Sequence, residues 1–395
     1  MKNKDKMKTE NATAQLETKV RKLWSKKKKI IVISSAVGIA LVLLAVVAVV
    51  IVYHYIGKVN IVENSGVDVN SVISDYADNL TGDSLDRSDI INKIEDDLAD
   101  DKTDGEDTDS DTVGGVNQQN LDNYNRMSQD IMDSPDVTNI LLIGTDSREG
   151  SDRGRSDSMI LLSVNEVTQR VTMFSFLRDI YIYIPGVGST RLNHSYAYGG
   201  PELTMQTISE NFGIRIDKYV QVDFYSFIQT VDAAGGVDIY VTDDEAALIN
   251  QYLDEINDLL GSPLGTDSVA GGGDLHLNGK QALCYARIRY IGTDFARTSR
   301  QREVLNQVIE KTRGMSMSEL DSFLNITLPL VTTNLTQSEL FSILLNASAY
   351  IDYERISDSI PLDGTYSFMT VRGMSVIGMD FDANISVLRS EIYGD

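Results

Sequence analysis

The chain has 395 residues and a formal net charge of −23, because 58 acidic residues outweigh 35 lysines and arginines. Its single cysteine, Cys284, excludes an intrachain disulfide framework and thiolate zinc sites. Nucleic acid is excluded as a partner, because the acidic bulk would be repelled by phosphates.

The N-terminal residues predict a membrane anchor. Residues 1–29 carry eleven lysines or arginines against three acidic residues, and residues 30–53 follow without a charge. As a helix rising about 1.5 Å per residue, this uncharged stretch would span about 36 Å, enough to cross a bilayer. The positive-inside rule then puts the N-terminus in the cytoplasm. We therefore expect a basic cytoplasmic tail, a single-pass anchor at residues 30–56 and an extracytoplasmic remainder.

Residues 57–136 have the composition of a stalk. Between residues 95 and 111 ten residues are acidic and only Lys102 is basic. Such a segment buries too little apolar surface to offset its ordering entropy, and its charges repel one another. It is predicted to be mostly disordered.

Residues 137–395 predict a folded α/β domain. An apolar run at residues 139–144 predicts a buried strand, with further strands at 158–164 and 171–183, the last interrupted at 177–179. A polar loop over residues 193–200 precedes a helix that begins at 201–202 and stops at Gly213, and strand, helix and strand follow at 219–222, 224–231 and 237–241. The next helix is capped at Leu277-Asn278-Gly279 and runs to about Arg287. Later helices are expected near 298–312, 316–329, 338–349 and 382–392, and strands near 366–371 and 375–379. Strands interleaved with helices indicate a layered α-β-α domain with a mixed central sheet.

Two aspartates adjoin predicted strands. Asp146 follows the first strand and Asp157 precedes the second. Ligands of open α/β sheets lie outside the strand ends, and carboxylates without nearby His or Cys suit Mg²⁺. Taken alone, an aspartate in the position of Asp146 is more often a turn or cap residue than a metal ligand.

Charged residues also interrupt the third strand region, where Arg178 and Asp179 stand between apolar residues. A charge in such a place needs a partner. Either the two form an internal salt bridge at a strand end, or they belong to a site.

The densest arginine cluster spans residues 285–302. Arg297, Arg300 and Gln301 share one face of the helix predicted there. Cations oppose the dipole at a helix N-terminus, so a bound anion would explain them; a solvated basic face is the alternative. Several arginines with magnesium fit pyrophosphate, whose charge builds on the leaving group. The cluster contains Arg287, Arg289, Arg297, Arg300 and Arg302.

In chain order these blocks resemble the LytR-CpsA-Psr family, over about residue 137 to the C-terminus. The resemblance rests on Gly144-Thr-Asp146-Ser-Arg148, Arg155-Ser-Asp157, Ser175-Phe-Leu-Arg178-Asp179, Leu192-Asn193, Asn278-Gly-Lys-Gln-Ala, Tyr285-Ala-Arg287-Ile-Arg289 and Asp294-Phe-Ala-Arg297-Thr-Ser-Arg300-Gln301.

The resemblance implies a role for each matching residue. Asp146 and Asp157 would hold Mg²⁺. Arg178, Asp179 and Asp294 are the catalytic candidates, either aspartate as the base that takes the acceptor proton. The resemblance also implies an apolar groove for a polyprenyl tail, which Met173, Phe174 and Phe176 could line. The pyrophosphate would be held by Arg155, Arg178, Arg287, Arg289, Arg297 and Gln301, with Arg300 assisting.

The function so implied is that of an enzyme in the cell membrane of a Gram-positive bacterium. This phosphotransferase would attach an anionic cell-wall glycopolymer, teichoic acid or capsular polysaccharide, from an undecaprenyl-pyrophosphate carrier to peptidoglycan. Three alternatives are a hydrolase of the carrier pyrophosphate, a non-enzymatic envelope regulator or attenuator, and a polysaccharide-binding module.

Overall fold

The computed structural model describes residues 54–62, 131–145, 156–350, 352–371 and 373–394. The chain divides into two compact units, residues 1–57 and 58–395. Within the described residues no helix is long and apolar enough to cross a membrane. The predicted anchor segment 30–53 lies outside these residues, as do residues 63–130 of the predicted stalk, Asp146 and Arg155.

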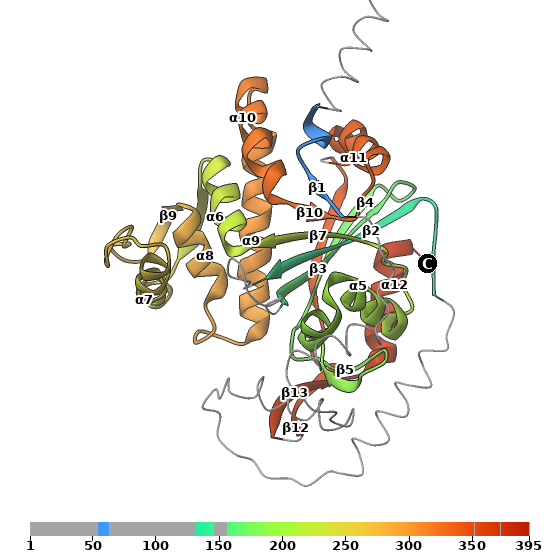
Figure 1. The fold of residues 1–395 in the computed structure, drawn as a ribbon. Coiled ribbons are helices and arrows are strands. Elements are labelled where there is room, and N and C mark those ends of the chain that lie inside the picture. The colour runs from blue at the N-terminus through green and yellow to red at the C-terminus, as the bar shows by residue number, and fades with distance from the viewer. Residues whose placement is uncertain (1–53, 63–130, 146–155, 351, 372, 395) are drawn as a thin grey trace, which may run out of the picture. The chain divides into compact units, whose positions relative to one another are not determined.

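A mixed sheet of seven strands lies at the centre of the unit formed by residues 58–395 (Figure 1). Parallel pairs join β1 to β10, β2 to β7 and β4 to β11, and the remaining neighbours are antiparallel. The mixed central sheet of the predicted α/β fold is thus confirmed. In sheet order the strands are β1 (Asn60–Ile61), β10 (Thr332–Thr333), β7 (Lys218–Asp223), β2 (Val137–Thr145), β3 (Ser156–Asn165), β4 (Arg170–Phe176) and β11 (Glu354–Ile360).

Three antiparallel strand pairs lie outside the central sheet. They are β5 (Tyr181–Ile184) with β6 (Gly188–Arg191), β8 (Val237–Val241) with β9 (Gly273–Leu277), and β12 (Tyr366–Val371) with β13 (Met374–Met379).

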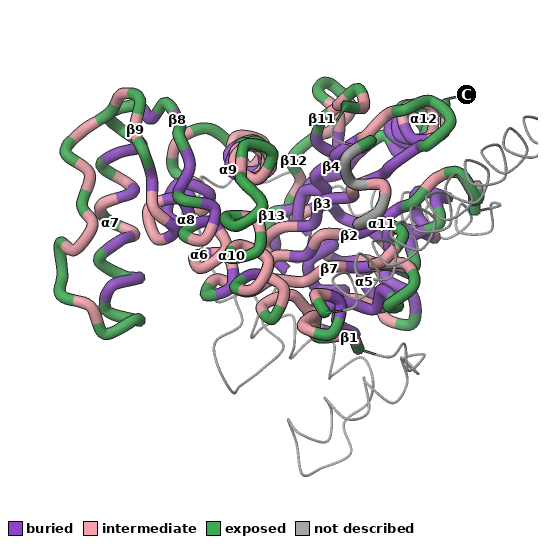
Figure 2. Tube along the Cα trace, turned by 90° about the horizontal axis from the view of Figure 1, so that it is seen from above, coloured by how far each residue is buried: buried purple, intermediate pink, exposed green. Residues whose placement is uncertain are grey.

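The helices divide into groups around the sheet. In Figures 1 and 2, α5 and α12 cover one face, while α6 to α9 gather at the edge where β2, β4 and β7 end. The helices are α5 (Asn193–Phe212), α6 (Phe224–Ala233), α7 (Asp243–Leu259), α8 (Gly279–Arg287), α9 (Asp294–Arg313), α10 (Met317–Thr327), α11 (Gln337–Tyr350) and α12 (Phe381–Tyr393), with a short 3-10 helix η1 at Leu328–Leu330.

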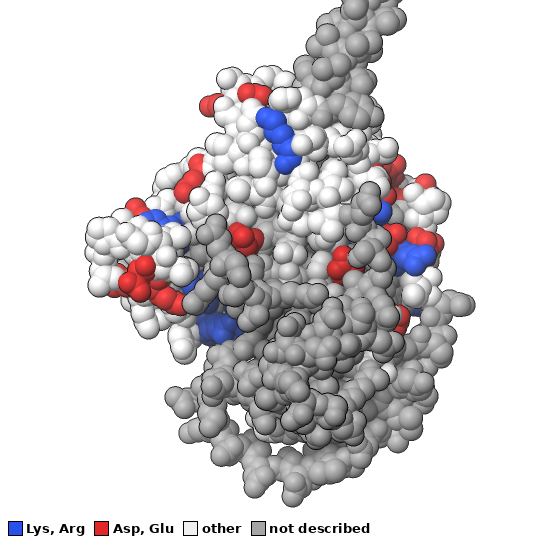
Figure 3. All heavy atoms as spheres, in the orientation of Figure 1, with Lys and Arg blue, Asp and Glu red and all other residues white. Residues whose placement is uncertain are grey.

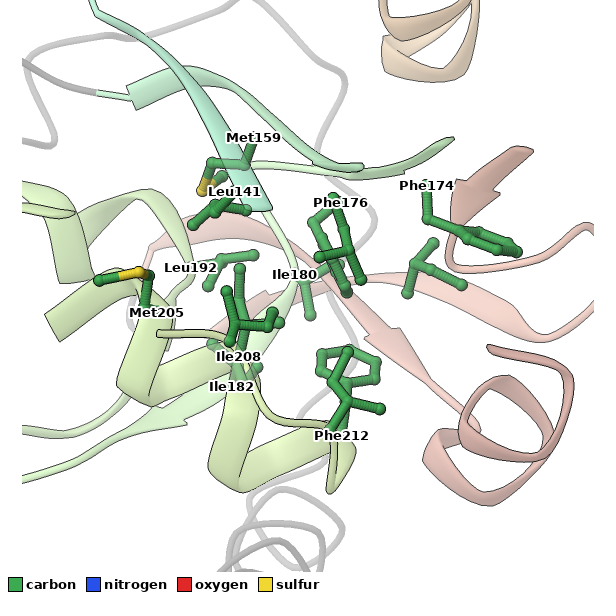
Figure 4. Packing of buried hydrophobic residues seen from close by; sticks show 14 of the residues in the cluster. Leu141, Met159, Phe174, Phe176, Ile180, Ile182, Leu192, Met205, Ile208 and Phe212 are labelled. Atoms are coloured by element: carbon green, nitrogen blue, oxygen red, sulfur yellow. The ribbon is translucent and has the colours of Figure 1, made fainter. Parts of the chain in front are cut away.

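The larger core fills the space between the sheet and α5 with α12. Side chains of a strand alternate between its two faces, so Leu141, Met159, Phe174 and Phe176 share one face and belong to the same core (Figure 4). The ring centre of Phe176 lies 4.9 Å from that of Phe212 on α5. Phe174 and Phe176 are each 1% exposed. They are therefore core residues, and the expectation that they could line an open lipid groove is wrong. Met173 lies on the opposite face of β4 by the same alternation.

A second core joins α6 to α9 with β8 and β9. Its helix α7 was not predicted, although the sequence contains the start signal. Thr242 and Glu245 form a reciprocal capping box, and Ile249, Leu253 and Ile256 bury one face. In Figure 3 exposed acidic side chains gather over α7. Asn278 caps α8 as expected, with Gln281 closing the box.

Several predicted boundaries need correction. Residues 193–198 were expected as a loop but form the first part of α5, which is kinked at Gly199 and Gly200 before Pro201. Strands β6, β9 and β11 were not predicted. Within the predicted stalk, Asn60–Ile61 pairs with β10 as an edge strand.

Candidate functional site

The predicted site residues converge on the sheet edge where α8 and α9 lie. Asp157 is the second residue of β3, and Arg178 and Asp179 follow the end of β4. Because β3 is antiparallel to β4, the start of one strand lies beside the end of the other. The segment between α8 and α9 brings Arg289 to the same place. Residues distant in the sequence thus form one cluster.

Asp157 is the carboxylate at the centre of the arginines. Its Oδ1 accepts a hydrogen bond from Arg178 Nη1 at 2.9 Å and lies 3.5 Å from Arg289 Nη2. Burial alone would raise the pKa of the Asp157 carboxyl, but the charges of Arg178, Arg289 and Arg297 outweigh it and hold this pKa below its ordinary value. Asp157 is therefore ionised and oriented by two guanidinium groups.

Asp179 and Asp294 form a hydrogen-bonded carboxyl pair. Burial and the negative charge of Asp294 raise the pKa of Asp179, whereas Arg297, Arg178 and the hydrogen bond from Asp179 hold the pKa of Asp294 below its ordinary value against burial. Such a pair binds its protons in two steps. As the pH falls, Asp179 takes up the first proton of the pair, and Asp294 is protonated only at lower pH.

Arg191 contacts the Asp179 carboxylate of this pair, and the sequence analysis did not identify it as a site residue. Its Nε lies 3.5 Å from Asp179 Oδ1 and donates to the carbonyl of Ser375 at 3.1 Å. The turn residues at 186–188 could have predicted the β5–β6 hairpin, whose register puts Arg191 opposite Tyr181 and so near Asp179.

Arg297 is the least satisfied charged residue of the cluster. Its side chain is 2% exposed, yet Nε, Nη1 and Nη2 have no hydrogen-bond partner among the described residues. The nearest carboxylate contact is 3.4 Å, from Nη1 to Asp294 Oδ1. Burial lowers the pKa of the Arg297 guanidinium. A buried cation with unused donors is costly unless an anion joins it.

Gln301 lies one helical turn after Arg297 on α9. Its Oε1 is also buried without a hydrogen-bond partner among the described residues. Arg297 and Gln301 therefore lie on one side of the helix, as the sequence predicted, where Arg297 has unused guanidinium donors and Gln301 an unused amide oxygen, which is an acceptor.

Arg300 has a different environment. Its Nε donates to Glu245 Oε1 at 2.8 Å, and Nη1 and Nη2 donate to the carbonyls of Ile288 and Ile291 at 3.2 and 3.0 Å. Each guanidinium nitrogen is engaged within the protein. These contacts make Arg300 a residue that joins α9 to α7, and its assistance at the anion site stays a prediction.

Arg287 also makes its contacts with helices, namely α6 and α7. Its guanidinium carbon lies 5.0 Å from the ring centre of Phe224 and 5.7 Å from that of Tyr252, and Nη1 lies 3.7 Å from Glu255. These are the contacts of a cation packed on aromatic faces. Among the described residues its ion-pair partner is Glu255 rather than a carboxylate of the cluster, so Arg287 lies beside the cluster.

The donor chemistry of Asp157 fits magnesium, which binds proteins through one or two carboxylates together with phosphate oxygens and water. Asp157 is ionised and its side chain is 22% exposed. No group of three or more His, Cys, Asp or Glu that could hold a metal occurs in the described part of the chain. Its predicted partner, Asp146, lies outside the described residues.

This arrangement can bind a polyanion and move a proton. Four guanidinium groups, from Arg178, Arg191, Arg289 and Arg297, face the three carboxyl groups of Asp157, Asp179 and Asp294. A diphosphate would match the donors that the cluster leaves unused. A hydroxyl next to the carboxyl pair could then pass its proton to one of these two carboxyl groups.

Curated proteins of similar sequence are named as teichoic acid transferases. The polyisoprenyl-teichoic acid–peptidoglycan teichoic acid transferase TagU of Oceanobacillus iheyensis is 36% identical over 221 residues, which cover 53% of this chain and 63% of that protein. The TagU of Bacillus licheniformis is 30% identical over 266 residues, covering 65% and 80% respectively. This chain thus spans less than two thirds of the first relative.

The fold is also shared with solved structures. A structure of TagT bound to LIIa-WTA superposes with a TM-score of 0.52 at 26% identity, covering 66% of this chain and 91% of that one. The model of the LytR_cpsA_psr family matches residues 96–380, well over half of the chain. The chain therefore belongs to the LytR-CpsA-Psr family.

Proposed function

We propose that this protein is a phosphotransferase that moves an anionic cell-wall glycopolymer from a polyprenyl-pyrophosphate carrier to peptidoglycan. The single observation that carries the proposal is the state of buried Arg297. Its three guanidinium nitrogens lack hydrogen-bond partners among the described residues. The charged groups of Asp157, Arg178 and Arg289 lie near enough to influence its pKa. The names of the relatives support the transferase activity and favour teichoic acid over capsular polysaccharide.

In this proposal the arginines bind the pyrophosphate and stabilise its transition state. Arg178, Arg289 and Arg297 would hold the phosphate oxygens, with Gln301 as a further donor. Their positive charge is already in place when negative charge builds on the departing phosphate, so little reorganisation is needed during the reaction. Arg155 would join them from the loop outside the described residues.

The acceptor hydroxyl oxygen attacks the phosphorus that bears the sugar. A new P–O bond forms as the bond to the bridging oxygen breaks, and the polyprenyl phosphate leaves with that electron pair. The hydroxyl proton goes to the Asp179–Asp294 pair. Of these two carboxyl groups, that of Asp294 stays ionised to a lower pH than that of Asp179. When bound at Asp157 and Asp146, Mg²⁺ would add positive charge beside the phosphates.

We further propose that the site faces the outside of the cell. The uncharged segment 30–53, after a basic tail, supports a cell-membrane anchor with a cytoplasmic N-terminus. A polyprenyl tail would also keep the substrate at the membrane surface. As part of the same proposal, the carrier is undecaprenyl-pyrophosphate and the organism is a Gram-positive bacterium, as the family resemblance implies.

Transfer with the purified full-length protein tests the proposal. A polyprenyl-pyrophosphate-linked glycopolymer and peptidoglycan fragments should yield a phosphodiester-linked product. Asp157→Ala and Arg289→Ala should abolish the product, whereas Arg313→Ala, an exposed arginine on the same helix as Arg297, should leave it unchanged. Phosphate release without labelling of the acceptor would instead identify a hydrolase. Glycan binding with the same affinity in both variants as in the unaltered protein, without transfer, would identify a binding module.

A further inference from the structure

The β12–β13 hairpin is attached directly to the segment that holds the carboxyl pair. The amide of Ile377 donates to the carbonyl of Asp179 at 2.8 Å, and a parallel bridge joins Ile377 to Ile180. Arg191 adds a second connection, since its Nε contacts both Ser375 of the hairpin and the carboxylate of Asp179. The position of this hairpin is therefore fixed relative to the groups that would take the acceptor proton.

A row of three aromatic rings leads from the carboxyl pair to the surface. Phe295 is the neighbour of Asp294 in the first turn of α9, and its ring centre lies 4.6 Å from that of Tyr366 on β12. The ring of Tyr366 lies 5.7 Å from that of Phe368 in an edge-on contact. Phe368 is 62% exposed. The row thus begins beside the catalytic candidates and ends in solvent.

Phe368 lies outside the small core that packs on the other face of the hairpin. Alternation along β12 places Met369 and Val371 on the opposite face, where they pack with Tyr181, Met374 and Val376 in a small core of their own. Phe368 follows Tyr366 on the other face. A large aromatic ring left in solvent, in line with two others at a reaction site, is typical of a binding surface.

We infer that Phe295, Tyr366 and Phe368 form the subsite for the acceptor glycan, the sugar chain whose hydroxyl attacks the phosphate. The inference rests on the proposed function. A pyranose ring presents C–H groups on its flat faces, which pack against the negative faces of aromatic rings, while its hydroxyls remain free for hydrogen bonds. A sugar stacked on this row would bring a hydroxyl towards Asp179 and Asp294.

The surroundings favour a sugar over the polyprenyl tail as the occupant. The row is short, and the next residue on the same face of β12 is Thr370, which is polar and exposed. A lipid tail needs a long continuous apolar strip. Half-buried apolar side chains that could contact a lipid tail occur elsewhere, on α9 and α10. They are Leu305, Val308, Ile309, Leu320, Phe323 and Leu324.

The test compares the full-length protein with Phe368→Ala. The Michaelis constant for soluble peptidoglycan glycan fragments should rise about fivefold, as expected for the loss of one aromatic contact. The constant for the lipid-linked donor should not change. Phe368→Trp, which keeps an aromatic face, should restore the acceptor constant. Met317→Ala, at an 82% exposed apolar residue of α10, is the matched control and should have no effect.

Calorimetric titration with the same glycan fragments separates this inference from the proposed function. Phe368→Ala should bind them about fivefold more weakly than the unaltered protein, whether or not transfer occurs. Equal binding, or a change confined to the donor constant, would overturn the subsite. Weakened glycan binding without any transfer would leave the subsite standing and overturn the proposed function alone.

Discussion

Arg297 and Arg300 stand three residues apart on α9, and both are buried, but their surroundings are opposite. Arg300 is anchored by Glu245 and two backbone carbonyls, whereas Arg297 has three nitrogens without hydrogen-bond partners among the described residues. Arg300 joins two helices, whereas Arg297 belongs to the anion cluster at the sheet edge. The partners of a buried arginine, more than its burial, separate a structural charge from one kept for a ligand.

The largest effect is expected from Arg297→Ala. Transfer should fall about 10²- to 10³-fold, the usual cost of removing one donor that stabilises transition-state charge. The free energy of unfolding should hardly decrease, because the substitution removes a poorly satisfied buried cation. Measuring transfer and urea unfolding on the same preparation checks both. A strongly destabilised protein would show that Arg297 is structural after all.

The next effect is on stability, in Arg300→Ala. Removing one partner of this buried ion pair leaves Glu245 uncompensated and should lower the free energy of unfolding by about 3 kcal/mol. Urea denaturation measures it. A double-mutant cycle with Glu245→Ala should give a coupling of at least about 1 kcal/mol. Additive losses would mean that the two side chains do not interact as the structure shows.

The smallest effect depends on pH. Hydrogen bonds from Thr242 and Arg300 hold the pKa of Glu245 below its ordinary value of 4.5, although burial opposes them. Because the folded-state pKa is depressed, this contribution to stability is present above 4.5 and is lost as the pH falls through the folded-state value.

Glu245→Gln therefore sharpens the comparison. The variant should be less stable than the unaltered protein well above pH 4.5, and the difference should shrink at lower pH. Thermal unfolding across this range measures it. A difference that stays constant with pH would show that the Glu245 charge does not stabilise the fold.

Local sequence signals predicted much of the fold and of the site. The capping residue Asn278, the strands leading to Asp157 and Arg178, and the shared helix face of Arg297 and Gln301 all follow from short-range spacing. The split between Arg297 and Arg300 could not, because Glu245 lies 55 residues earlier on a helix that was not predicted. Strand β11 was missed for a similar reason, since its mostly polar residues become a sheet strand only by pairing with β4.

The central claim, that Arg297 is held ready for a pyrophosphate, is tested most directly by binding. A short soluble polyprenyl pyrophosphate should bind the unaltered protein and Arg313→Ala equally, and it should bind Arg297→Ala at least about tenfold more weakly, the loss of one charged hydrogen bond. Arg297→Lys should restore only part of the affinity, because lysine lacks the planar fork of donors. Equal affinity in Arg297→Ala and the unaltered protein would contradict the claim.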